Sequence, residues 1–441
     1  MGAKACNKML YGFLLLLLAV ILPFAFVVNN ILFLILIVFF ILMFVRTANN
    51  VSAKFLVAFF VSVLFSGISI LNLRPYDIVT IIALIYVLVK KRGTLSVPYK
   101  ILPFAFVVIF VCAVNFNGDA LLETVRYIIS FLLLLVVLNI DDCSFDDIKF
   151  QVAIIGIVNI LFAFATFLLF KKGMITNYTS GIFESNLFLS NAEVRMFGFF
   201  SDPNKFMCFS FAMIFVIEYF MKKSRQRTLL IWIFIAGSIL SLSRTALLVV
   251  ALYIGCKILV KIKECSKLAF WAVIISGTLI FVLLFLLDGF EPLLNFVYSS
   301  MAKILNRDWT ASLGSTVTED SRFLIWKRAL EHIGESPLWG HGWMSNTFLL
   351  PYPTHNTILA LMLDGGILAL IPFVICFWPL IKVKRWELTL PFVIVPSLLL
   401  DLQNYRVWFL ILGLILVDER RKAKQKRCEN ELDCVNQEMG T

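Results

Sequence analysis

Long apolar runs recur along the whole chain, and they restrict the folds that the chain can adopt. Runs of roughly 15 to 25 residues with few charges match the length that a helix needs to cross a bilayer. Hydrophobic residues make up 61% of the chain and charged residues 15%, which excludes an ordinary water-soluble domain. We therefore predict an all-α polytopic integral membrane protein with about 12–14 transmembrane helices and two long extracytoplasmic loops. In round numbers the candidate spans are 10–28, 31–45, 55–71, 76–90, 100–115, 124–140, 150–170, 203–221, 228–243, 245–260, 268–287, 355–381, 388–400 and 405–417.

Lys and Arg gather on one side of these spans. If the N-terminus is cytoplasmic, the most basic segments all lie on the cytoplasmic side, as the positive-inside rule requires. These segments include KKRG at 90–93, KKSRQR at 222–227 and ERRKAKQKR at 419–427. The expected organisation is N-terminal helices at 1–170, a first outer loop at 171–202, central helices at 203–287, a large outer loop at 288–354, C-terminal helices at 355–417 and a basic cytoplasmic tail at 418–441.

Composition and motifs exclude several classes of function. The net charge of +11 follows from topology and anionic lipid, and no separate basic domain calls for nucleic acid. The nine cysteines are scattered singly, so we expect neither a disulfide framework nor a zinc site. There is no GxxxxGK[ST] phosphate loop and no DxD pair, which disfavours ATP-driven and nucleotide-sugar enzymes. We expect a reaction without cofactor or metal, on a donor that is already activated and held in the membrane.

Charged, aromatic and hydrogen-bonding residues cluster before a membrane-length helix only in residues 321–370. An amphipathic helix is predicted at the start of this segment, ended by Gly334 and Pro337. Its predicted apolar stripe is Phe323, Trp326, Leu330 and Ile333.

A second helix is predicted after Pro351 and Pro353, with Thr354 capping a start at His355 and Asn356. At such a helix start the dipole favours a neutral imidazole that can accept a proton, and free N–H groups favour an anion. His355 is thus a candidate base, with a capping or interfacial histidine as the alternative. Of the other two histidines, His332 is interpreted as a surface residue and His341 as part of a turn between Gly340 and Gly342, two glycines expected to permit that turn.

Two arginines lie at the predicted outer boundary. Arg244 stands in a turn so short that its guanidinium must lie at the membrane edge, where it needs an anion such as a phosphate, a lipid headgroup or a buried carboxylate. Arg195 either holds a phosphate or anchors the first outer loop. After it, Asp202 and Asn204 are expected to cap a helix that has Pro203 in its first turn.

Several of these residues, taken in order, resemble the O-antigen ligase and Wzy-type repeat-unit polysaccharide polymerase superfamily of bacterial inner-membrane proteins. GFFSDPNKF at 198–206 and SLSRTALL at 241–248 resemble the same superfamily. One departure is Ala369, where ligases carry Gly, Thr or Tyr three residues after the last motif glycine. The residues that carry the resemblance are Arg322, Trp326, Leu330, Pro337, Leu338, Gly340, Gly342, His355, Asn356 and Gly366.

The resemblance implies a glycosyltransferase on the periplasmic face of the bacterial cytoplasmic membrane, using an undecaprenyl-diphosphate-linked oligosaccharide donor and a glycolipid acceptor. It implies His355 as general base, with Arg244 and Arg322 neutralising the diphosphate that leaves. The candidate substrate-binding residues are Arg195, Arg328, Asn356 and Trp326.

Polymerisation of repeat units into O-antigen or capsular polysaccharide is the first prediction for the activity, and Ala369 tilts the choice towards it. Transfer of the glycan to lipid A-core by an O-antigen ligase is the second. A lipid-linked sugar flippase or transporter is the third. Besides the bilayer and the glycolipids, a chain-length regulator and a flippase are candidate partners.

Overall fold

The structure is a computed structural model of the 441-residue chain. It describes residues 3–28, 30–66, 74–91, 94–115, 118–140, 143–172, 174, 196, 198–200, 202–241, 243–286, 322–383, 385–403 and 405–439.

The described residues form helices and connecting turns without a strand, which confirms the predicted all-α polytopic membrane fold. In the first half the helices are α1 (Ala3–Val28), α2 (Asn30–Arg46), α3 (Val51–Leu64), α4 (Pro75–Lys91), η1 (Tyr99–Ile101), α5 (Leu102–Val114), α6 (Gly118–Asn139) and α7 (Phe145–Lys171). In the second half they are α8 (Pro203–Phe220), α9 (Arg225–Leu240), α10 (Arg244–Cys265), α11 (Lys267–Leu286), α13 (Arg322–Glu335), α14 (Ser345–Phe348), α15 (Thr357–Lys382), α16 (Trp386–Thr389), the π-helical turn η3 (Leu390–Ile394), α17 (Val395–Leu399) and α18 (Arg406–Met439).

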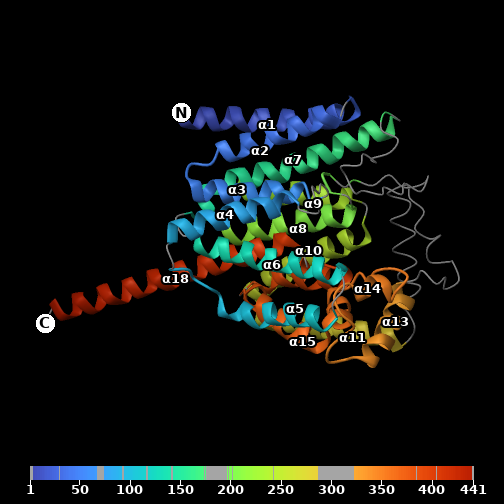
Figure 1. The fold of residues 1–441 in the computed structure, drawn as a ribbon. Coiled ribbons are helices and arrows are strands. Elements are labelled where there is room, and N and C mark those ends of the chain that lie inside the picture. Colours follow the sequence, from blue (N-terminus) through green and yellow to red (C-terminus); the bar gives the residue numbers. More distant parts are fainter. Residues whose placement is uncertain are drawn as a thin grey trace.

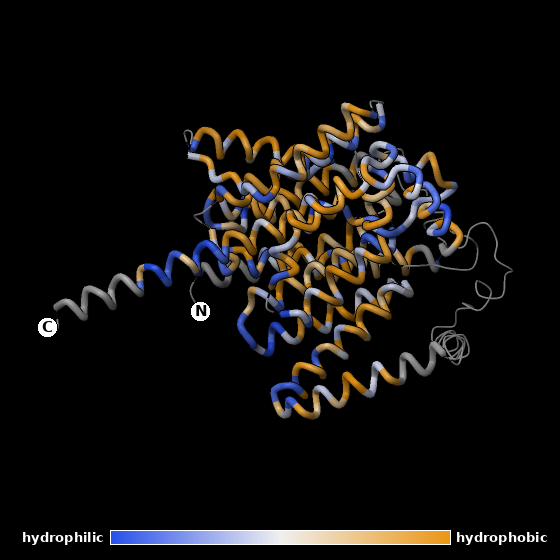
Figure 2. Tube along the Cα trace, turned by 90° about the horizontal axis from the view of Figure 1, so that it is seen from below, coloured by the Kyte–Doolittle hydropathy of each residue, from blue (hydrophilic) through white to orange (hydrophobic). Residues whose placement is uncertain are grey.

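Four described helices are long and apolar enough to cross a membrane: Gly118–Asn139, Phe145–Leu169, Thr245–Cys265 and Thr357–Lys382. Shorter apolar helices of 10–17 residues accompany them, among them Leu10–Ala25 and Val51–Leu64. The longer helices run back and forth through one bundle, with α13 and α14 gathered at one of its ends (Figure 1). Apolar residues fill the middle of the helices and hydrophilic residues collect near their ends (Figure 2). This distribution is typical of helices that cross a lipid layer.

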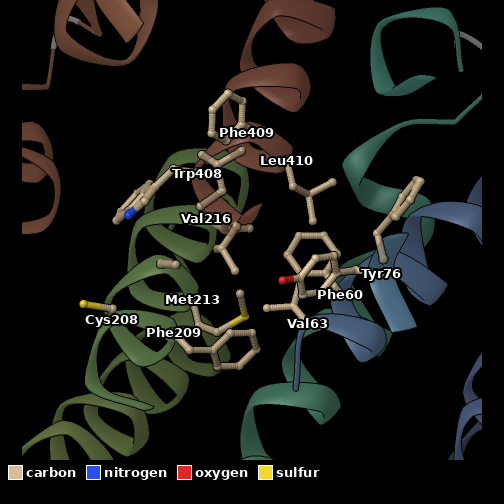
Figure 3. Packing of buried hydrophobic residues seen from close by; sticks show 14 of the residues in the cluster. Phe60, Val63, Tyr76, Cys208, Phe209, Met213, Val216, Trp408, Phe409 and Leu410 are labelled. Atoms are coloured by element: carbon tan, nitrogen blue, oxygen red, sulfur yellow. The ribbon is translucent and has the colours of Figure 1, made fainter. Parts of the chain in front are cut away.

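Helix α8 lies inside the bundle rather than at its surface. Every residue from Phe206 to Glu218 is buried, so this helix is covered by protein over most of its length. Figure 3 shows its side chains in one core with those of α3 and α18, and Tyr76 of α4 lies farther away, beyond the α3 side chains. The outer helices instead expose large apolar side chains, such as Phe13 and Leu42 at 63% and 62%. Such exposed faces are suited to contact with lipid tails. The residues labelled in Figure 3 are Phe60, Val63, Tyr76, Cys208, Phe209, Met213, Val216, Trp408, Phe409 and Leu410.

Hydrogen bonds between helix ends define the two ends of the bundle. The starts of α8 and α10 meet where the Ser243 hydroxyl donates to Asn204 at 3.0 Å. The starts of α15 and α18 lie beside a second contact, in which Leu402 N donates to Thr357 Oγ1 at 2.9 Å. We call this the His355 end. The ends of α8, α10 and α15 meet around Glu218, which contacts Lys257 and Arg385, and we call this the Glu218 end.

Candidate active site at the His355 end

The stripe through which helix α13 packs on α15 overlaps the predicted one at Ile333, and the side chain of Phe323 lies outside the described residues. Ile325, Ala329 and Ile333 are buried and form a small core with Leu350 and Leu363. The amphipathic helix and its end near Gly334 are confirmed, but the prediction that Leu330 belongs to the apolar stripe was wrong, because 59% of Leu330 is exposed. The residues at spacing i, i+4 face α15, and periodicity alone does not say which of two adjacent stripes a neighbouring helix will cover.

Trp326 ties α13 to the loop before α15. Its indole Nε1 donates to the carbonyl of Thr354 at 2.8 Å. The N–H of this predicted substrate-binding residue is therefore engaged within the protein, and its role here is to hold the loop that carries His355.

The turn after α13 docks on a break in α15. Amide N–H groups of His341 and Gly342 donate to the carbonyls of Leu363 and Asp364 at 2.7 and 2.8 Å. In return Ile367 N donates to the Pro337 carbonyl at 2.9 Å. These bonds satisfy carbonyl and N–H groups that the interruption of α15 leaves without helical partners.

Glycines make this docking sterically feasible. Gly340 and Gly342 have φ values of 67° and 100°, which confirms their predicted role in a tight turn. Gly366, inside α15, has φ 63° and ψ −160°, and a Cβ there would lie 2.3 Å from the carbonyl carbon and oxygen of Leu338. The motif glycines thus act through backbone geometry. The expected continuous span at 355–381 is a helix interrupted at Gly366.

A buried carboxylate lies beneath the same turn. Asp364 is 4% exposed and accepts a hydrogen bond from the Ser345 hydroxyl at 2.8 Å, with the Asn346 N–H at 3.4 Å. Trp343, two residues before Ser345, is fully buried and donates from Nε1 to the Val108 carbonyl at 2.8 Å. These contacts fix the loop between α13 and α15 against α5 and α15.

The cap of α15 is Asn356, so the prediction that Thr354 caps a helix starting at His355 was wrong. The side-chain oxygen of Asn356 accepts from the N–H groups of Ile358 and Leu359 at 3.0 and 3.1 Å. Asn is among the best capping residues, and the Thr354 hydroxyl donates to Asp401 instead, so the helix starts at Thr357. His355 therefore lies just before the cap, in the left-handed region with φ 49°. Histidine is one of the few side chains enriched in that region.

Asp401 holds the backbone around His355. Its carboxylate accepts from the N–H groups of His355 and Asn356 at 3.1 and 3.0 Å and from the Thr354 hydroxyl at 3.1 Å. The same carboxylate lies 3.5 Å from His355 Nδ1, at ion-pair distance. The His355 side chain is 42% exposed, so a ring held by protein on one side stays open to solvent.

The segment that carries Asp401 is fixed to α15. Thr357 Oγ1 donates to the Leu400 carbonyl at 2.7 Å and accepts from Leu402 N at 2.9 Å. Asp401 is not among the site residues predicted from the sequence. A signal was present, because this carboxylate interrupts two apolar runs at the predicted outer boundary, where a charge is costly unless it has a partner.

A second acidic–basic pair is buried at the same end of the bundle. Arg406, the first residue of α18, lies 3.8 Å from Asp77, and both side chains are 4% exposed. The Arg406 guanidinium also lies 5.3 Å from the centre of the Tyr76 ring. This pair joins the start of α18 to α4 and so supports the Asp401 segment that precedes it.

The predicted arginines fall on the same end of the bundle as far as the structure describes them. Arg244 is the first residue of α10, and Arg322 is the first residue of α13. Their side chains, and all of Arg195, lie outside the described residues. Arg328 is half-buried on α13. Asp202 caps α8 by accepting from Asn204 N at 2.8 Å, and Pro203 is in the first turn, so this prediction is confirmed for Asp202 and Pro203.

An apolar pocket of about 160 Å³ begins at the start of α15 and lies between α15, η3, α17 and α18. Thr357 and Leu402, which join α15 to the Asp401 segment, line it together with Phe373, Phe377 and Trp408. Its position places a hydrophobic cavity directly next to the His355 loop. In the part of the chain that the structure describes, no group of three or more His, Cys, Asp or Glu side chains could hold a metal ion.

Residues 229–374 match the O-antigen ligase family. The match confirms the resemblance to this superfamily over the stretch from α9 to α15, which includes Arg244, Arg322 and His355. Together with the apolar helices it indicates a multi-pass bacterial membrane protein with a role in glycan processing. Asp401 lies beyond the part that matches the family. Comparison with curated proteins gives no match.

Proposed function

We propose that this protein is a glycosyltransferase on the outer face of the cytoplasmic membrane. It would join undecaprenyl-diphosphate-linked oligosaccharide repeat units into O-antigen or capsular polysaccharide. The observation that carries the proposal is the contact between His355 and Asp401 in a chain whose residues 229–374 match the O-antigen ligase family. A histidine beside a carboxylate and open to solvent is suited to general base catalysis.

In this mechanism His355 accepts the proton of the acceptor hydroxyl. The hydroxyl oxygen forms a bond to the anomeric carbon of the donor while the bond from that carbon to the diphosphate oxygen breaks. The electron pair leaves with undecaprenyl diphosphate. Asp401 lies 3.5 Å from Nδ1, which favours the tautomer that keeps its proton there. Nε2 is then the nitrogen with a free lone pair.

Negative charge grows on the diphosphate as it leaves, and arginines are the residues that would neutralise it. Arg244 and Arg322 open α10 and α13 at the His355 end. A guanidinium fork binds phosphate oxygens in two places, and such contacts lower the barrier when they strengthen in the transition state. Arg195 and Arg328 remain second candidates for binding the donor.

Asn356 and Trp326 take positioning roles in this proposal. The Asn356 side chain caps α15 and the Trp326 indole holds the Thr354 carbonyl, so both fix the loop in which His355 stands. The apolar pocket beside Thr357 offers a place for part of the polyprenyl chain, because its lining is almost entirely hydrophobic.

The second candidate function is O-antigen ligation, which uses the same donor and a different acceptor. The description of the matching family favours it, and Ala369 in place of Gly, Thr or Tyr favours the polymerase. A flippase or transporter is the third candidate. It would need ionisable residues along a path through the membrane rather than a group of them at one end.

The glycan phenotype of a deletion strain tests these alternatives. Loss of a polymerase leaves glycans of a single repeat unit on the carrier. Loss of a ligase leaves long polymer on undecaprenyl diphosphate without attachment to lipid A-core. An unchanged glycan profile would contradict both enzyme activities, and repeat units trapped on the inner face would indicate the flippase.

A further inference from the structure

A second cavity opens at the Glu218 end, on the opposite side of the bundle from His355. Its volume is about 460 Å³, and it lies between the last turns of α8 and α10 and the first part of α9. It shares no lining residue with the pocket beside Thr357. This cavity therefore belongs neither to the candidate active site nor to the reaction proposed for it.

One wall of the cavity is strongly basic. Lys223, Arg227, Lys257 and Lys261 line it, against the single carboxylate of Glu218. That carboxylate is already shared, since it forms ion pairs with Arg227, with Lys257 at 3.0 Å and with Arg385 at 2.7 Å, and it accepts from the Tyr253 hydroxyl at 2.8 Å. Glu218 thus anchors its neighbours without cancelling the positive charge of the wall.

Lys223 and Lys261 are the two cations of this wall that Glu218 does not engage. Both are exposed, and neither has an ion-pair partner among the described residues. Two ammonium groups at the mouth of a cavity, with a buried arginine and a lysine behind them, present donors suited to a phosphate group.

The remaining lining of the cavity forms a largely apolar wall. Ile231, Trp232 and Ile235 of α9 lie on it with Ile254 and Ile258 of α10. Trp232 and Ile258 are each 55% exposed, although they lie on helices whose other faces pack in the bundle. A ligand that fits both walls must carry an anionic group at one end and a hydrocarbon chain at the other.

We infer that this cavity binds an anionic phospholipid. Its headgroup phosphate would lie against Lys223 and Lys261, and an acyl chain would run along Trp232 and Ile258. The position supports this choice, because the basic wall lies where the helices end and the apolar wall lies along the helices themselves. An anionic membrane surface attracts basic residues at this depth. The inference goes beyond the proposed glycosyl transfer and does not depend on it.

Quenching of Trp232 by brominated lipid tests the inference on the full chain in nanodiscs. Two kinds of disc are compared, both made mainly of unlabelled phosphatidylcholine. One contains a small fraction of phosphatidylglycerol with brominated acyl chains, and the other contains the same fraction of phosphatidylcholine with brominated acyl chains. The difference between wild type and Trp232→Phe isolates the signal of Trp232 from the other tryptophans. We expect quenching by brominated phosphatidylglycerol to be several-fold stronger than by brominated phosphatidylcholine.

A pair of double variants separates the cavity from general surface charge. Lys223→Gln with Lys261→Gln should lower the preference for phosphatidylglycerol by at least about tenfold, because the headgroup phosphate loses both of its charged hydrogen-bond donors. Lys222→Gln with Lys263→Gln removes the same charge from exposed neighbours that do not line the cavity, and it should leave the preference nearly unchanged. Equal losses in both double variants would overturn the inference in favour of non-specific attraction.

Two further outcomes count against a lipid site. Equal quenching by the two brominated lipids would mean that the cavity does not select an anionic headgroup. Displacement of brominated phosphatidylglycerol by millimolar inorganic phosphate would identify free phosphate as the ligand. If Trp232→Phe does not fold, mass spectrometry of the lipids retained after detergent extraction replaces the quenching signal. Retained phosphatidylglycerol should then fall in the cavity double variant and persist in its control.

Discussion

Asp401 accepts a hydrogen bond from the backbone N–H of His355 at 3.1 Å, across 46 residues of sequence. The same carboxylate binds Asn356 N and lies 3.5 Å from His355 Nδ1, so it holds the backbone of the candidate base and lies beside its ring. This contact brings a residue beyond the family match to the centre of the candidate site. It also yields the sharpest test of the proposed mechanism.

Asp401→Asn should lower the transfer rate more than about tenfold while the protein still inserts and folds. One amide oxygen can still accept hydrogen bonds from the loop, but the charge beside His355 Nδ1 is lost, and an amide NH₂ in its place favours the unproductive tautomer. The measurement is the initial rate of polymer formation by purified enzyme. Asp146→Asn, an exposed carboxylate in the first turn of α7, is the matched control and should be neutral. Normal turnover of Asp401→Asn would remove this residue from the mechanism.

His355→Asn should abolish most of the transfer, by about 10²- to 10⁴-fold, and leave donor binding nearly intact. Asn tolerates the left-handed backbone at φ 49° and keeps a polar side chain, so this variant removes the base with little change in the loop. His355→Gln gives a second variant without a base. Both variants should be deficient to a similar degree, because neither amide side chain accepts a full proton near neutral pH. Near-normal turnover of either variant would restrict His355 to a structural role.

Arg322→Lys and Arg244→Lys should each lower polymer yield at normal abundance in the membrane, and the alanine variants should lower it further. Lysine keeps the charge but loses the fork that binds two phosphate oxygens. Polymer per enzyme molecule is the quantity to measure. Arg225→Lys, in the first turn of α9 at the Glu218 end, is the control. Full activity of Arg322→Ala would exclude this side chain from the proposed mechanism.

Gly366→Ala should destabilise the protein by at least about 1–3 kcal/mol, because its backbone conformation is nearly restricted to glycine. The added Cβ would also lie 2.3 Å from the carbonyl group of Leu338, which forces the docked turn away from α15. Thermal unfolding of detergent-extracted protein measures the change. Gly255→Ala, in the middle of α10 with open space around its Cβ, should be neutral or slightly stabilising. Equal stability of the two variants would show that the turn can dock without this glycine.

Reporter fusions test the orientation of the bundle. Fusions after residues 225, 264, 384 and 424 should report the cytoplasm, and fusions near 185 and 315 should report the outside. The turns between α8 and α9 and between α10 and α11 lie among basic residues, which is why the fusions after 225 and 264 are expected inside. A cytoplasmic signal at 315 would place the His355 end on the wrong side for its proposed substrate.

The sequence alone determined the features that depend on neighbouring residues. Apolar runs of membrane length predicted the all-α membrane fold, and the cap at Asp202 with Pro203 after it was predicted from three adjacent residues. The turn glycines Gly340 and Gly342 were recognised for the same reason, because their backbone conformation is a local requirement. Periodicity, capping preference and glycine conformation are all encoded within a few positions.

Only the tertiary structure decided which distant residues meet. The buried stripe of α13 contains Ile325 and Ala329 and leaves Leu330 exposed, because the choice depends on where α15 lies. The docking of the 337–342 turn on the break at Gly366 depends on the same packing. Asp401 reaches His355 because Thr357 joins the start of α15 to the segment before α18. No local propensity specifies such contacts, since they follow from how the helices pack and bring their ends together.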